Sequence, residues 1–176
     1  AINCVKLGEV LVLQPRFDAE ELLRLIEAHR LSHLHAVPTM FNRLLDLPDE
    51  RRARFDPSSL RAVVHGAAMC PPDVKRAMIE WWGPVLLEYY AATEVGIVTA
   101  ATAAERLAHP GTVGRPPAGV DIRIAGPDGE ALPPGEIGEI TIASDMAALV
   151  SYLHLPDETA ELRRGERVTL GDIGYQ

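Results

Sequence analysis

Short apolar runs alternate with amphipathic segments over the first 90 residues. Four of these runs predict strands, at residues 10–13, 33–37, 60–65 and 85–90. The run at 10–13 is continuously apolar, as in a strand that is buried on both faces. Apolar residues at helical spacing predict helices in the three intervals between the strands, over 22–29, 40–45 and 72–82. Strands that alternate with helices predict an α/β fold, a right-handed and mostly parallel sheet with helices on both faces.

Two of the predicted helices have recognisable ends. Asp18 can cap the first turn of the first helix, and Glu21 stands three residues further on, as in a capping box. Pro72 suits the first turn of the third helix, and Gly83 followed by Pro84 ends it.

The pattern changes near residue 110. Residues 120–124 and 137–142 alternate strictly between apolar and polar side chains, and Asp128-Gly129 between them is typical of a hairpin turn. This part predicts a small antiparallel sheet or barrel. We therefore expect two subdomains, an α/β subdomain over residues 1–110 and an antiparallel β subdomain over residues 111–176.

Composition narrows the class of protein. The 176 residues carry 17 Lys and Arg against 25 Asp and Glu, a formal net charge of −8, so no basic excess is available to bind nucleic acid. No apolar run approaches the roughly 20 residues that cross a bilayer, and the two cysteines form no disulfide framework, which predicts a cytoplasmic protein. The chain begins with Ala1 and stops straight after Tyr175 and Gln176, and we expect it to be an internal piece of a longer protein.

Three segments at predicted strand ends could carry chemistry, because ligands of open parallel sheets bind beyond the carboxyl ends of the strands. Residues 65–68 are small enough for a flat group to lie on the backbone, although a tight turn would also select them. Residues 88–94 offer two aromatic rings, a hydroxyl and a carboxylate that suits a hard cation, or form an amphipathic strand that runs into a capped helix. Asp172 lies between glycines, where it could accept hydrogen bonds from a ribose diol or form an ordinary turn.

Taken together and in this order, residues 60–94 and 110–175 resemble the adenylate-forming superfamily, especially the acyl-CoA synthetases. The segments that carry the resemblance are His65-Gly66-Ala67-Ala68, Tyr90-Ala91-Ala92-Thr93-Glu94, Val113-Gly114-Arg115-Pro116, Pro133-Pro134-Gly135-Glu136-Ile137-Gly138-Glu139 and Leu170-Gly171-Asp172-Ile173-Gly174-Tyr175. Tyr152 followed by Pro156-Asp157-Glu158-Thr159 also matches a stretch of that family. The resemblance implies a flavodoxin-like subdomain of the adenylate-forming fold over residues 1–110.

The resemblance also implies a nucleotide site. Gly66, Ala67 and Ala68 would line the adenine, Tyr90 would pack against the base, and Asp172 would hold both ribose hydroxyls. ATP, AMP and Mg²⁺ are the implied ligands, with CoA as cosubstrate.

Catalytic and acid-binding roles follow from the same resemblance. Thr93 would contact the α-phosphate, and Glu94 would ligate Mg²⁺. The acyl pocket and thiol channel would use five further residues: Val37, Pro38, Met40, His65 and, beside the channel, Gly96.

The implied reaction has two steps, in which a fatty or other carboxylic acid attacks the α-phosphate of ATP and CoA then displaces AMP from the acyl-adenylate. The family's phosphate loop and lysine-bearing C-terminal domain have no counterpart in the sequence, so we expect these 176 residues alone to be inactive. Ala91 replaces a family glycine and would be strained at positive φ. An adenylation domain that loads a carrier protein, a luciferase-like enzyme and a non-catalytic nucleotide-binding module are the alternatives.

Overall fold

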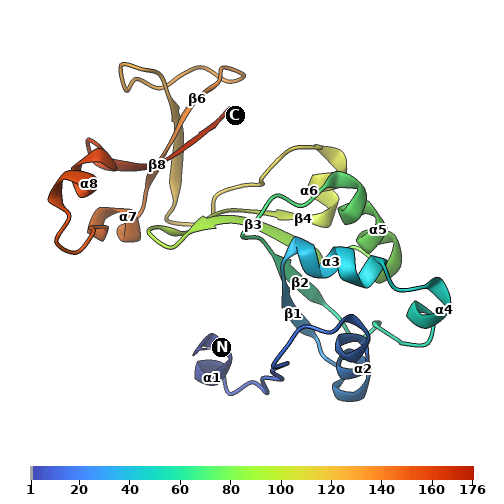
Figure 1. Ribbon diagram of the computed structural model, residues 1–176. Coiled ribbons are helices and arrows are strands. Elements are labelled where there is room, and N and C mark those ends of the chain that lie inside the picture. The colour runs from blue at the N-terminus through green and yellow to red at the C-terminus, as the bar shows by residue number, and fades with distance from the viewer. Residues whose placement is uncertain (1) are drawn as a thin grey trace. The chain divides into compact units, whose positions relative to one another are not determined.

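The structure is a computed structural model that describes residues 2–176, apart from the side chains of Ile2, Asn3 and Val5. The chain divides into two compact units, residues 1–87 and 88–176, and the boundary falls inside β3 (Figure 1). The subdomain boundary expected near residue 110 stays a prediction. Within the described residues, no helix is long and apolar enough to cross a membrane.

Unit 1 alternates helices with strands, as the pattern predicts. Its elements are α1 (Ile2–Leu7), α2 (Ala19–His29), β1 (His33–Ala36), α3 (Pro38–Leu45), α4 (Asp49–Arg52), β2 (Ala62–His65), α5 (Pro72–Trp82) and the first residues of β3 (Leu86–Ala92). β1 and β2 pair in parallel with His33 opposite Ala62, and the first sheet has the strand order β1-β2-β3-β4. The helices pack through α3, which contacts both α2 and α5.

The core of unit 1 is built around Phe41 of α3. The ring of Phe41 is fully buried and meets His65 and Trp82 edge-on, with centroids 5.1 and 6.4 Å away. Ile26 and Met78 are also fully buried, so each of the three helices gives one apolar stripe to this core. The spacing of apolar residues thus predicts the three helices of this core.

The helix ends follow the sequence signals. Asp18 caps α2 by accepting the Glu21 N–H at 2.8 Å, while the Glu21 carboxylate accepts from Arg24 at 2.6 Å instead of completing a capping box. Pro72 opens α5, and Gly83 ends it with φ +82°.

The strand predicted at residues 10–13 is wrong. Within the described part of the chain this run has no regular secondary structure, and Val10 and Leu13 are 90% and 74% exposed. A strand needs a neighbour for its backbone N–H and C=O groups, and the sequence pattern reports apolarity without reporting a neighbour. The fourth strand of the first sheet is β4 (Gly96–Thr102) instead. Because only three residues separate β3 from β4, these two strands form an antiparallel hairpin and the sheet is mixed.

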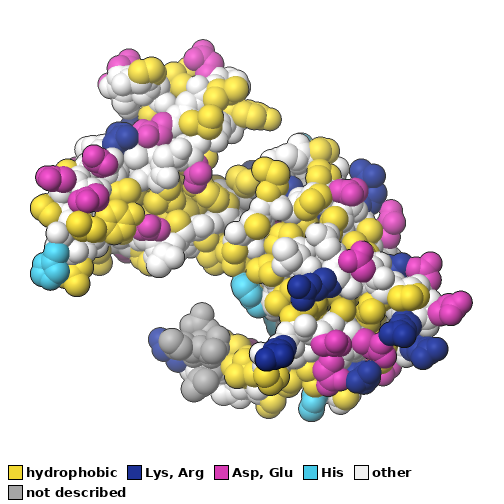
Figure 2. Space-filling model, viewed as in Figure 1, with side chains coloured by type: hydrophobic (Ala, Val, Ile, Leu, Met, Phe, Trp, Pro, Cys, Tyr) yellow, Lys and Arg dark blue, Asp and Glu magenta, His cyan; other side chains and the backbone are white. Residues whose placement is uncertain are grey.

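Unit 2 contains the hairpin and a second, antiparallel sheet. After β4 come α6 (Ala103–Ala108), β5 (Asp121–Ala125), β6 (Gly138–Ala143), α7 (Asp145–Leu149), α8 (Pro156–Glu161), β7 (Arg163–Arg164) and β8 (Arg167–Gly174). The second sheet has the order β5-β6-β8-β7, with Ile122 opposite Ile142. The alternating runs therefore form the antiparallel sheet that the sequence predicts. On the face in Figure 2, hydrophobic side chains lie exposed among acidic ones over α7 and α8.

Gly114 allows the loop that precedes β5 to pack against β4. Ala100 and Arg115 exchange two backbone hydrogen bonds of 3.0 Å, and an added Cβ on Gly114 would lie 1.9 Å from the Ala100 carbonyl oxygen. Only glycine allows this approach, because the contact is with backbone and the φ of Gly114 is +92°.

Candidate nucleotide site

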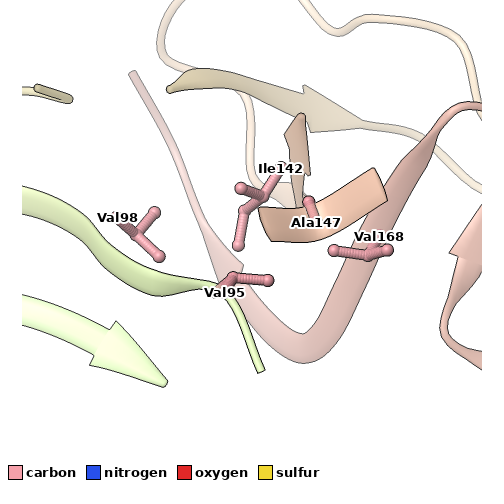
Figure 3. Close-up of a cluster of buried hydrophobic side chains, with 5 residues drawn as sticks. All are labelled: Val95, Val98, Ile142, Ala147 and Val168. Atoms are coloured by element: carbon pink, nitrogen blue, oxygen red, sulfur yellow. The ribbon is translucent and has the colours of Figure 1, made fainter. Parts of the chain in front are cut away.

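One buried cluster fixes the elements of unit 2 that carry the candidate residues. Its five members come from the β3–β4 turn, β4, β6, α7 and β8, and are Val95, Val98, Ile142, Ala147 and Val168 (Figure 3). All five are at most 3% exposed, and Tyr90, Val150 and Leu170 pack against them. The strand before Thr93, the strand that carries Asp172 and the segment before Tyr152 thus share one core.

Tyr90 and Asp172 meet although 82 positions separate them. The Tyr90 hydroxyl at the middle of β3 donates to Asp172 Oδ2 in β8 at 2.5 Å. Burial and the neighbouring carboxylate raise the pKa of Tyr90 well above its ordinary value, so its hydroxyl remains a donor at neutral pH. The two residues that the resemblance assigns to base and ribose therefore lie side by side.

Glu94 lies in the turn between β3 and β4 and has a phenol as partner. Tyr152 Oη donates to Glu94 Oε1 at 2.9 Å, and this hydrogen bond raises the pKa of Tyr152. Thr93 lies exposed in the same turn, which leads into β4 and not into the capped helix considered from sequence. Gly96 follows at φ +71°, and a Cβ there would lie 3.1 Å from the Met146 sulfur.

A divalent cation fits Glu94 as one carboxylate ligand among several. Among the described residues no group of three or more His, Cys, Asp or Glu side chains could enclose a metal ion. Glu94 accepts a hydrogen bond on one oxygen from Tyr152, which leaves the other oxygen for a ligand. Mg²⁺ commonly takes one or two protein carboxylates and completes its shell with phosphate and water, so a single carboxylate suits a cation that arrives with a nucleotide.

The segment predicted to line the adenine lies in unit 1. It follows β2 directly, with Gly66 buried and with Ala67 and Ala68 exposed. Ala67 has φ +67°, which is uncommon for a residue with a Cβ. The strain considered for Ala91 is absent, because Ala91 lies within β3 and is not among the described residues with positive φ.

The candidate acyl-pocket residues of unit 1 lie after β1 and at the end of β2. Met40 lines a groove of about 770 Å³ together with residues 9–14 and Leu25. Val37 instead precedes α3 as its N-cap, and Pro38 is buried at the first turn. His65 is 1% exposed and packs against Phe41. The grouping of Val37, Pro38, Met40 and His65 into an acyl pocket stays a prediction.

Sequence reasoning missed the contact between Tyr152 and Glu94. The sequence marks Tyr152 and Thr159 as part of a family-like stretch. No sequence pattern, however, pairs a tyrosine with a carboxylate 58 positions away. Sequence reasoning also missed Arg163, whose guanidinium donates to three backbone carbonyls at the end of α7.

The mixed first sheet and the antiparallel second sheet define an α/β protein with a candidate nucleotide site in unit 2. The model of the family described as AMP-binding enzyme matches residues 2–152, and the chain belongs to that family.

Curated and solved relatives agree with this membership. The chain is 32% identical over 172 residues to the long-chain-fatty-acid–CoA ligase of Bacillus subtilis, covering 97% of the chain and 30% of the relative. The amide bond synthetase McbA from Marinactinospora thermotolerans matches at 32% identity with a TM-score of 0.84, over 93% of this chain and 34% of McbA. O-succinylbenzoate coenzyme A synthetase (MenE) from Bacillus subtilis, in complex with AMP, matches at 25% identity with a TM-score of 0.84, over 99% of this chain and 35% of MenE. The chain therefore spans about a third of the length of these relatives.

Proposed function

We propose that the chain forms part of an ATP-dependent carboxylate–CoA ligase. In this reaction the carboxylate of a fatty or other organic acid attacks the α-phosphorus of ATP, pyrophosphate leaves, and an acyl-adenylate forms. The thiolate of CoA then attacks the acyl carbon and AMP leaves. The observation that carries the proposal is the hydrogen bond from Tyr90 to Asp172, which joins two motifs that the resemblance assigns to a nucleotide site.

The pair suits an adenosine. Asp172 is exposed and carries two acceptor oxygens, of which one accepts from Tyr90. A ribose diol offers two donors, so the carboxylate can accept a ribose hydroxyl on its second oxygen while the adjacent aromatic ring covers part of the base. β3 and β8 pack on one core, which holds Tyr90 and Asp172 close together.

Thr93 and Glu94 lie immediately beyond Tyr90 along the hairpin, where the phosphates of the same nucleotide would follow. The Thr93 hydroxyl would donate to the α-phosphate, and the Glu94 carboxylate would hold Mg²⁺, which supplies charge neutralisation on the phosphates when bound. Gly96 would leave room for the incoming thiol beside Met146, because a side chain on residue 96 would meet the sulfur of Met146.

CoA is the proposed acceptor, because the name of the fatty-acid relative and that of MenE state CoA. McbA is named as an amide bond synthetase, so an amine is the competing acceptor. Supplying the acyl-adenylate with CoA or with an amine, and identifying the product by mass spectrometry, separates the two.

Calorimetric titration of this chain with AMP and with 2′-deoxy-AMP tests the nucleotide site. We expect AMP to bind more tightly, and Asp172→Asn to weaken AMP binding while the affinity for 2′-deoxy-AMP changes less. Asp157→Asn is the matched control, because it also removes an exposed carboxylate from unit 2 and should bind AMP like the unmutated chain. Equal loss of both nucleotides in Asp172→Asn would contradict a contact between Asp172 and the ribose 2′-hydroxyl.

We propose further that the 176 residues bind nucleotide without completing the reaction. The chain would then yield no acyl-CoA when supplied with ATP, Mg²⁺, a fatty acid and CoA. Product formation at rates usual for enzymes would refute this part of the proposal and leave the nucleotide site unaffected.

A further inference from the structure

Tyr152 begins a short loop that closes on itself through Thr159. The Tyr152 N–H donates to Thr159 Oγ1 at 2.9 Å, and the same hydroxyl donates to the Leu155 carbonyl at 2.7 Å. The Leu155 N–H donates back to the Tyr152 carbonyl at 3.2 Å. Thr159 is thus both acceptor and donor in one ring of hydrogen bonds, and it belongs to α8, which starts at Pro156.

The residues just before Tyr152 are fixed by Arg163. Its guanidinium donates to the carbonyls of Ala147, Ala148 and Val150 at 3.1, 3.1 and 2.9 Å. Carbonyls in the last turn of a helix lack partners within it, and the guanidinium supplies them at the end of α7. Since Ala147 is fully buried in the unit 2 core, the backbone that enters Tyr152 is tied to that core.

The phenol of Tyr152 extends from this anchored backbone to Glu94. Tyr152 Oη lies 2.9 Å from Glu94 Oε1, and among the described residues Tyr152 is the hydrogen-bond donor to this carboxylate. Glu94 is half-buried at the hairpin turn between β3 and β4. The phenol holds one carboxylate oxygen and leaves the other for a further ligand.

We propose that Tyr152 and Thr159 are positioning residues for the cation site, with Thr159 fixing Tyr152 and Tyr152 fixing the Glu94 carboxylate. The inference rests on the proposed function in one respect, the role of Glu94 as ligand of the cation that accompanies the nucleotide. Groups that hydrogen-bond a ligating carboxylate orient it, and their loss typically weakens metal binding by about 10- to 100-fold. Because Glu94 is one ligand among several, we expect about tenfold.

The test measures how the affinity of this chain for a non-hydrolysable ATP analogue depends on Mg²⁺. Tyr152→Phe and Thr159→Val should each need about tenfold more Mg²⁺ for half-maximal binding. Thr159→Ser keeps the hydroxyl and should need no more Mg²⁺ than the unmutated chain. Thr159→Ser therefore serves as the matched control. Affinity for the analogue without Mg²⁺ should be the same in all these variants.

The double variant Tyr152→Phe/Thr159→Val tests whether Thr159 acts through Tyr152. We expect the double variant to need the same Mg²⁺ concentration for half-maximal binding as Tyr152→Phe alone. If the effects of the two substitutions multiply, Thr159 does not act through Tyr152, and the proposed positioning role of Thr159 is overturned. Nuclear magnetic resonance of ¹³Cζ-labelled tyrosine adds a readout without nucleotide. The Tyr152 signal should move in Glu94→Gln and in Thr159→Val, and should keep its position in Thr159→Ser.

The outcomes separate this inference from the proposed function. Unchanged Mg²⁺ dependence in Tyr152→Phe, with tight Mg²⁺-dependent binding in the unmutated chain, would overturn the positioning role and leave the proposed function standing. Nucleotide binding that ignores Mg²⁺ in the unmutated chain would overturn the cation role of Glu94, and the positioning role with it. A Tyr152 signal that stays in place in Glu94→Gln would overturn the contact itself.

Discussion

Gly114 is the glycine of unit 2 at which an added Cβ would approach the backbone most closely, and Gly114→Ala should strongly destabilise the fold. The new Cβ would lie 1.9 Å from the Ala100 oxygen, 2.2 Å from the Ala100 carbonyl carbon and 2.6 Å from the Ala101 nitrogen. All three atoms are backbone, so no side chain can rotate away to relieve the overlap. The loop must therefore leave β4, and its contacts with that strand are lost.

The expected loss of unfolding free energy follows from those contacts. Separation breaks two backbone hydrogen bonds between Ala100 and Arg115, worth about 1 kcal/mol each. It also moves the Val113 carbonyl, which accepts from the buried Thr99 hydroxyl at 2.6 Å, for about 1 kcal/mol more. A Cβ at φ +92° adds at least about 1 kcal/mol. We expect Gly114→Ala to lower the free energy of unfolding by about 4 kcal/mol.

Gly111→Ala is the control that isolates the close approach. Gly111 has φ +94°, and nothing lies within 4 Å of an added Cβ, so this variant should lose only about 1 kcal/mol. Urea unfolding followed by far-ultraviolet circular dichroism measures both variants. If the two lie within about 0.5 kcal/mol of each other, below the effect of a single hydrogen bond, the close approach does not stabilise the fold and the reasoning fails.

Three further outcomes are expected. Ala67→Gly should be more stable than Ala68→Gly by about 1 kcal/mol in urea unfolding, because only Ala67 has positive φ; equal stabilities would show that the φ of +67° is not strained. Burial and the neighbouring carboxylate raise the pKa of Tyr90, so its contribution to stability is complete below its ordinary pKa near 10 and is lost as the pH rises through the raised value. Tyr90→Phe should therefore flatten the alkaline loss of thermal stability, and an unchanged alkaline limb would contradict the contact. Arg164 donates to both carboxylate oxygens of Glu139 at 2.8 and 3.0 Å and lowers the Glu139 pKa from 4.5, so this pair stabilises the fold above about pH 4.5 and its contribution fades as the pH falls through the lowered pKa. Arg164→Met should therefore lower the free energy of unfolding by up to about 1 kcal/mol at neutral pH and by less in acid. An equal loss at both pH values would refute this pH dependence.

Local patterns predicted the parts of the fold that depend on neighbours in sequence. Asp18 caps α2 and Gly83 ends α5, because capping depends on residues within one turn. The alternation at 120–124 and 137–142 likewise identified two strands that pair with each other. These elements need no information from distant parts of the chain.

Elements that depend on distant partners were missed or misassigned. The apolar run at 10–13 was predicted as a strand, although within the described residues no strand pairs with it. β4 was missed because Thr93 and Glu94 were interpreted as a strand end that could lead into a capped helix, and the two residues form a hairpin turn instead. At the site, the motifs indicated which residues matter, while the partners of Glu94 and Asp172 became visible only when the chain was folded.

The exposed apolar run at residues 10–13 affects how copies of the chain interact with one another. Copies of the chain repel one another at neutral pH through a formal net charge of −8, and this repulsion disappears as the pH approaches the isoelectric point near 5.2. Val10 and Leu13 then present apolar surface to neighbouring copies without an opposing charge. Mild acid should therefore make the chain self-associate, to an extent that rises with its concentration.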